Sequence, residues 1–200
     1  MGFSRRIFMG LVAGAWLGLG VSGAQALTED QARAHVTSTI EQLTTLLKTA
    51  GTSASRAPEL RRIMEESANM PLIAKFSAGR GWREMNEAQQ GRFVEAFAKF
   101  VSETYSRRFD EFSGDPEINI GRTIDAGRKG ILVETLMSQS NGRPIAVEWL
   151  VSDRGGRVEI VDMVVEGISM AATQREEIGA MLDKRNGDVE ALISDLAAGG

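Results

Sequence analysis

The segment Gly-Ile-Ser-Met-Ala at residues 167–171 is the place where the sequence comes nearest to a nucleophile elbow. It lies between a predicted strand and a predicted helix, as the catalytic serine of an α/β-hydrolase does. However, its last small residue is Ala171 rather than glycine, and no histidine follows Ser169 to act as the base of a triad. The neighbouring strands are also predicted to be antiparallel. We therefore interpret Ser169 as a helix N-cap and expect no enzyme activity.

The other groups that could do chemistry are few. His35 is the only histidine, and its polar neighbours favour a solvated surface position. Glu134, Glu148, Asp162 and Glu166 fall in the predicted sheet, where a carboxylate pair could do acid/base work, but a solvated or helix-paired face is the simpler interpretation. The sequence has no cysteine, which excludes thiol chemistry, disulfides and cysteine-ligated zinc. We expect no metal and no cofactor.

The first 26 residues have the organisation of a cleaved export signal. Arg5 and Arg6 precede an apolar run at 11–21, and Ala24 and Ala26 supply the small residues that a signal peptidase reads. The run is too short to span a bilayer, which needs about 20 apolar residues. These features predict a periplasmic protein cleaved near Ala26. The arginine pair favours the twin-arginine (Tat) route, with the Sec route as the alternative.

Residues 27–200 have the length of a single domain. The signal contains two of the 23 basic residues and none of the 27 acidic ones, so the mature chain has a net charge of about −6. A mildly acidic chain argues against nucleic-acid binding, which needs a basic face. It also argues against lasting adsorption to an anionic membrane.

The hydrophobic pattern changes period along the chain. Apolar residues recur every three or four positions in the predicted helices, which are 28–50, 59–67, a short segment at 70–76, 86–112, one after Gly167 and one at 189–196. They alternate in the predicted strands, which are 118–124, 130–138, 145–152 and 157–165. Asn141-Gly142 is a strong hairpin signal. The order predicts an α+β fold, with an antiparallel sheet of about four strands against several helices.

Both the long helix and the strands present strongly apolar faces. By periodicity alone, an ordinary packed core is the default interpretation. Several methionines would suit an adaptable cavity wall, but they would suit a core equally. The pattern therefore leaves a cavity and a filled core open.

Residues 161–170, Val-Asp-Met-Val-Val-Glu-Gly-Ile-Ser-Met, resemble the signature of the MlaC family of periplasmic phospholipid-binding proteins, also called toluene-tolerance proteins. Further similar segments follow it at 173–178 and 187–193 and precede it at Trp82, 89–97, Tyr105 and 141–144. No motif is long, but the order and spacing extend over nearly the whole mature chain.

The resemblance implies a twisted antiparallel sheet, covering helices and a deep apolar pocket between them for lipid tails. We expect the following residues to line this pocket: Phe76, Trp82, Phe93, Phe97, Val101, Tyr105, Ile131, Val133, Val147, Trp149, Val161, Met163, Val165, Ile168 and Met170.

The resemblance also implies a function and partners. The family's carriers shuttle phospholipid between an inner-membrane ABC transporter complex and an outer-membrane lipoprotein complex, which maintains outer-membrane lipid asymmetry. We expect a monomer that binds neither metal nor nucleic acid. Two alternatives stay open. The cargo could be a hopanoid-type lipid, because a related branch accompanies hopanoid synthesis, or the domain could be a periplasmic interaction module with a filled core.

Overall fold

The computed structural model describes residues 27–49, 51–109, 117–138 and 143–199. The predicted export signal at 1–26, the predicted turn at 141–142 and the predicted end of the long helix at 112 lie outside these ranges. No helix within them is both long and apolar enough to cross a membrane.

The helices of the described residues occupy both ends of the chain. They are α1 (Glu29–Thr49), α2 (Ser53–Ser67), α3 (Met70–Ala78), α4 (Gly81–Glu84), α5 (Glu87–Arg108), α6 (Met170–Lys184) and α7 (Val189–Ala198), with a short 3-10 turn, η2 (Gly127–Lys129), between the first two strands. The predicted start of this second helix at residue 59 is wrong. Thr52 and Ser55 form a capping box that begins the helix earlier, so Pro58 lies inside it.

The middle of the chain forms one antiparallel sheet in the order β1-β2-β3-β4-β5. The strands are β1 (Glu117–Asp125), β2 (Ile131–Ser138), β3 (Ile145–Ser152), β4 (Glu159–Val165) and β5 (Ile168–Ser169). The α+β fold class is confirmed, with one short strand more than predicted. That strand forms because Glu166 and Gly167, with φ of 49° and 82°, turn the chain back onto β4.

A β-bulge in β4 changes which of its side chains face the helices. Trp149 is opposite Met163 and Val151 is opposite Ile160, so Val161 lies in the irregular stretch between two registered pairs. A bulge inserts one extra residue and reverses the alternation beyond it. For this reason Ile160 is buried while Val161 is only half-buried, although unbroken alternation predicts the reverse.

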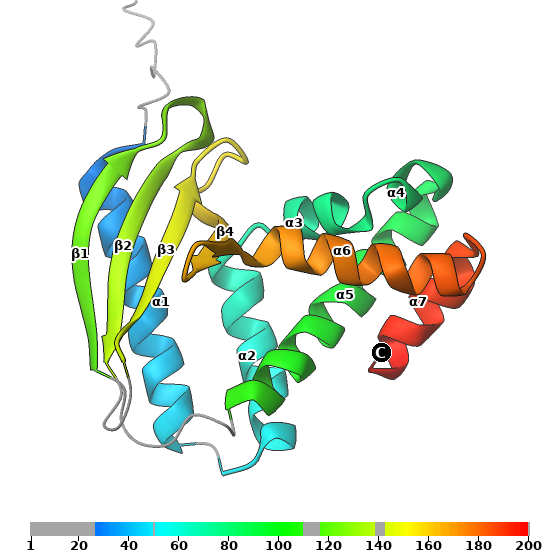
Figure 1. Cartoon of the computed structure of the whole chain (residues 1–200), viewed down its shortest axis with the longest axis horizontal. Helices are drawn as coiled ribbons and strands as arrows, with labels where there is room; N and C mark the ends of the chain where they lie inside the picture. Colours follow the sequence, from blue (N-terminus) through cyan, green and yellow to red (C-terminus); the bar gives the residue numbers. More distant parts are fainter. Residues whose placement is uncertain (1–26, 50, 110–116, 139–142, 200) are drawn as a thin grey trace, which may run out of the picture.

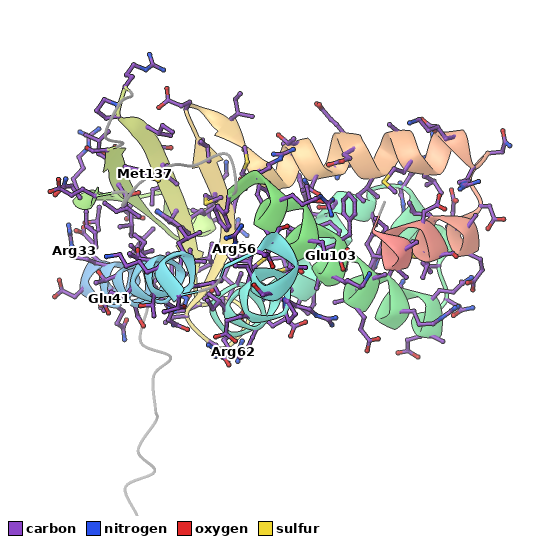
Figure 2. The ribbon with its side chains drawn as sticks, turned by 90° about the horizontal axis from the view of Figure 1, so that it is seen from below. Arg33, Glu41, Arg56, Arg62, Glu103 and Met137 are labelled. Atoms are coloured by element: carbon purple, nitrogen blue, oxygen red, sulfur yellow. The ribbon has the colours of Figure 1, made fainter. Side chains whose placement is uncertain are left out.

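The elements are arranged as a sheet-and-helix layer with a helical body beside it. In Figure 1, α1 lies behind β1–β3, and α3, α5, α6 and α7 extend to the side of β4. Seen from below in Figure 2, α1 and α6 lie at different levels, and Arg62 on α2 points away from the body. The core lies between these layers and includes the fully buried side chains Val36, Phe97 and Val133.

Candidate functional site

An apolar cavity of about 190 Å³ lies where the sheet meets the helical body. It is lined by residues from α1, α2, α3, α5, the first turns of α6, and the strands β3 and β4, and it is open on one side. Its walls consist of Thr39, Leu43, Leu60, Ile63, Met64, Ser67, Ala68, Met70, Ile73, Phe97, Val101, Tyr105, Phe109, Trp149, Ile160, Asp162, Met163, Met170, Ala171 and Gln174.

Helix α5 supplies one wall as a stripe of side chains. Phe97, Val101 and Tyr105 recur every four residues on one face of the helix, Phe109 continues this spacing at the C-cap, and all four contact the cavity. The N-terminal half of the stripe is the most buried, since Phe97 is 0% and Val101 is 4% exposed. This wall follows directly from the helical spacing of the sequence.

The sheet supplies the opposite wall through Trp149. Its indole Nε1 donates a hydrogen bond of 3.0 Å to Oγ1 of Thr135, which itself donates to the carbonyl of Val147. A buried indole N–H needs such a partner, because leaving it unpaired would be costly. With its polar edge satisfied, the ring can present an apolar face to the cavity.

Four methionines, Met64, Met70, Met163 and Met170, lie in the cavity wall. An unbranched thioether side chain can change rotamer and fill irregular space at low cost. At about 190 Å³ the cavity is smaller than the roughly 300–1,000 Å³ that is usual for small-molecule binding sites. A larger ligand therefore requires wall side chains to move, and the methionines are the ones best able to do so.

The most strongly polar group in the wall, Asp162, is fully engaged by the protein. Its Oδ1 accepts hydrogen bonds from the backbone N–H of Met163 at 2.8 Å and of Ala171 at 3.0 Å, and its Oδ2 accepts one from Ser169 at 2.6 Å. Ser169 in turn accepts a hydrogen bond from the N–H of Ala172 at 3.1 Å. The N-cap role predicted for Ser169 is confirmed, and Asp162 fixes the start of α6.

Residues 25–198 match the family model described as MlaC protein. The chain belongs to the MlaC family. Among solved structures, it is similar to a phospholipid-binding protein from Ralstonia solanacearum in complex with a phospholipid, with a TM-score of 0.64 and 18% sequence identity. The match covers 82% of this chain and 94% of that one. At this identity the likeness shows a shared fold.

The structure brings together only part of the pocket predicted for this MlaC-family chain. The predicted residues that line the cavity are Phe97, Val101, Tyr105, Trp149, Met163 and Met170. Others lie in the core away from it, either buried (Phe93, Ile131, Val133, Val147) or partly buried (Trp82, Val165). Val161 lies at the bulge of β4, where it does not reach the cavity.

Two predicted wall residues face solvent instead. Ile168 is 60% exposed because it follows the tight turn that starts β5. Phe76 is 45% exposed on the outer side of α3, where the guanidinium of Arg175 lies 5.0 Å from its ring centre. Neither side chain belongs to the cavity.

Sequence reasoning missed the walls that α1, α2 and α3 provide. Leu43, Leu60, Ile63 and Ile73 are apolar residues of the predicted segments 28–50, 59–67 and 70–76, so hydrophobic periodicity does mark them. Periodicity does not show whether an inward face contacts another side chain or a cavity. The resemblance rested on segments elsewhere in the chain, so it did not direct attention to these helices.

The remaining candidate groups for chemistry take structural roles. His35 is half-buried, with Nε2 2.7 Å from the carbonyl oxygen of Ser67, so the prediction of a solvated surface histidine is wrong. Glu134 forms a two-bond ion pair with Arg122, which lowers the pKa of its carboxyl group. Within the described ranges, no cluster of His, Asp and Glu could hold a metal ion.

Proposed function

We propose that this protein carries a membrane phospholipid and holds its acyl chains in the cavity between the sheet and the helices. The observation that carries the proposal is a hollow apolar centre, lined by Phe97, Trp149 and four methionines, in a chain of the MlaC family. The structurally similar Ralstonia solanacearum protein is described as binding phospholipid, which supports the same class of ligand here.

The energetics suit a carrier rather than a permanent store. Burying a methylene group is worth about 0.8 kcal/mol, so roughly 30 methylenes in two chains would give a gross gain of about 24 kcal/mol from water. That exceeds the practical ceiling of about 18–21 kcal/mol for noncovalent binding. Lipid tails in a bilayer are already out of water, so transfer into the cavity recovers little of this gain. The carrier needs only near parity with the membrane.

Near parity means that a partner must bias loading and release. We propose that the partners are an inner-membrane ABC transporter complex and an outer-membrane lipoprotein complex, and that this protein acts between them in the periplasm as a monomer. The signal-like first 26 residues and the resemblance to periplasmic carriers support this location. No catalytic step and no cofactor is part of the proposal, because Ser169 and Asp162 are engaged in capping α6.

The direct test is to purify residues 27–200 after secretion and to identify what co-purifies. Native mass spectrometry should show one added mass of phospholipid size, and organic extraction should release a glycerophospholipid. A hopanoid in the extract would keep carriage but change the cargo. Protein that is folded and free of lipid, before and after incubation with phospholipid vesicles, would refute carriage and favour an interaction module with a closed core.

A further inference from the structure

The polar groups in the cavity wall differ in whether their hydrogen-bonding capacity is used. The hydroxyls of Thr39 and Ser67 donate to carbonyl oxygens one turn earlier in their own helices, at 2.9 and 2.7 Å. Asp162 accepts three hydrogen bonds. Tyr105, the only tyrosine in the sequence, donates to the thioether sulfur of Met170 at 3.5 Å. Thioether sulfur is a weak acceptor, so this hydroxyl can still form a stronger bond.

The neighbour of Tyr105 on α6 makes this part of the wall unusual. Gln174 is only 3% exposed, and its amide nitrogen donates to the carboxylate of Glu177 at 3.2 Å. This bond fixes the orientation of the amide, since only nitrogen can donate to a carboxylate. The amide oxygen, Oε1, is buried, and none of the described residues donates a hydrogen bond to it. Among the polar residues of the cavity wall that the structure describes, Tyr105 and Gln174 are thus the two whose hydrogen-bonding capacity is not fully used.

The surroundings keep the phenol in its neutral, proton-donating form. Burial raises the pKa of the Tyr105 hydroxyl, with Arg108 acting against the rise, Glu177 adding to it and the nearby Gln174 side chain opposing it. The guanidinium of Arg108, which is exposed, lies 5.4 Å from the centre of the tyrosine ring. The hydroxyl is therefore a donor at neutral pH, between a deep apolar wall and a cation at the surface.

We propose that the Tyr105 hydroxyl donates a hydrogen bond to an ester carbonyl oxygen of the bound lipid and so sets the depth to which the lipid enters. This inference rests on the proposed carriage of phospholipid. An ester carbonyl is a better acceptor than a thioether, and it is the first polar atom next to the tails. Phe97 lies about 12 Å further along α5 at 1.5 Å per residue, which leaves an apolar wall for the tail beyond the ester.

The experiment compares two lipids that differ only at their two ester carbonyls. Delipidated protein is incubated with an equimolar mixture of dipalmitoyl phosphatidylcholine and its dihexadecyl ether analogue, and the loaded forms are counted by native mass spectrometry. The wild-type protein should prefer the diester about fivefold, the usual net effect of one hydrogen bond. Tyr105→Phe, which removes a single oxygen, should load both lipids equally. Val101→Ala on the same stripe should lower both loads and keep the preference.

A second measurement needs no variant. Because the chain has one tyrosine, absorbance during a pH titration reports Tyr105 alone. A hydrogen bond from the neutral phenol should raise the pKa of Tyr105 in the diester-loaded protein by about 0.7 relative to the ether-loaded protein. This shift corresponds to the same fivefold preference for the diester. Equal loading of the two lipids by the wild-type protein, a preference that survives in Tyr105→Phe, or equal pKa values would overturn the inference. Failure to load either lipid would instead refute carriage.

Discussion

Replacing Ala171 with phenylalanine tests whether the apolar centre is a cavity or a packed core. Ala171 is 8% exposed and lines the cavity from the first turn of α6. Its backbone N–H donates a hydrogen bond of 3.0 Å to Asp162, and this bond does not depend on the side chain of residue 171. The substitution therefore adds a ring to the cavity without removing a hydrogen bond from the start of the helix.

The size of the cavity sets the expected effect. A benzene ring fits a cavity of about 150 Å³, and residual cavity volume costs about 24 cal/mol per Å³. Filling most of a cavity of about 190 Å³ could therefore stabilise the lipid-free protein by up to about 3.6 kcal/mol. Imperfect fit lowers this, so we expect a gain of about 1–3 kcal/mol. The same substitution in a filled core would cost about 1–3 kcal/mol, so the sign of the change decides between the two.

The assay is urea unfolding of the delipidated protein, together with lipid loading by native mass spectrometry. Ala171→Phe should raise the unfolding midpoint and prevent loading. Ala98→Phe is the matched control, because Ala98 is 2% exposed in the core and does not line the cavity. It should lower the midpoint. If Ala171→Phe destabilises the protein as much as the control does, the centre is packed. If the variant is folded and fully loaded, lipid binds elsewhere.

Three further predictions concern other parts of the site and its support. Val101→Glu should abolish lipid loading, because an unpaired carboxylate in an apolar wall costs several kcal/mol. Ile168→Glu, at an exposed position, should load lipid normally by mass spectrometry and change the free energy of unfolding by no more than about 0.5 kcal/mol. Equal effects of the two variants would contradict the position of the cavity. Asp162→Ala removes three accepted hydrogen bonds and should lower stability by about 2–4 kcal/mol in urea unfolding, and an unchanged midpoint would show that α6 needs no such cap. The hydrogen bond from Arg185 lowers the pKa of Asp195 below its usual 3.8, so this pair should stabilise the fold at neutral pH and lose that effect as the pH falls through the lowered pKa. The difference in unfolding free energy between the wild type and Arg185→Ala should therefore shrink in acid, and a difference that stays constant with pH would count against the pair.

Local patterns in the sequence were sufficient for most of the elements. The stripe on α5 was predicted because identical spacing on a helix always places side chains on one face. The cap at Ser169 was predicted because a small hydroxyl before an amphipathic segment satisfies a free backbone N–H. The α+β order followed from the change of hydrophobic period. In each case the cause lies within a few residues of its effect.

The errors have causes that lie far apart in the sequence. The alternation of β4 failed at Val161 because the bulge is set by pairing with β3. His35 was assigned to solvent because its partner, the carbonyl of Ser67, lies on the next helix. Ile168 was predicted to line the pocket because it belongs to the family-like segment 161–170, but the turn at Glu166 and Gly167 reverses the chain just before it.

The sequence by itself determined most of the helices and antiparallel strands, the apolar faces and the absence of cysteine chemistry, because these depend on residue type and on spacing along the chain. It did not determine that the apolar faces enclose space instead of filling it. That depends on how the helices pack on the sheet and on one another, as α1 does on β1 and β2 and α2 does on α5, and these contacts join residues that are far apart in the sequence. A hydrophobic face has the same period whether it touches another side chain or a cavity, so only the tertiary structure could separate a lipid site from a core.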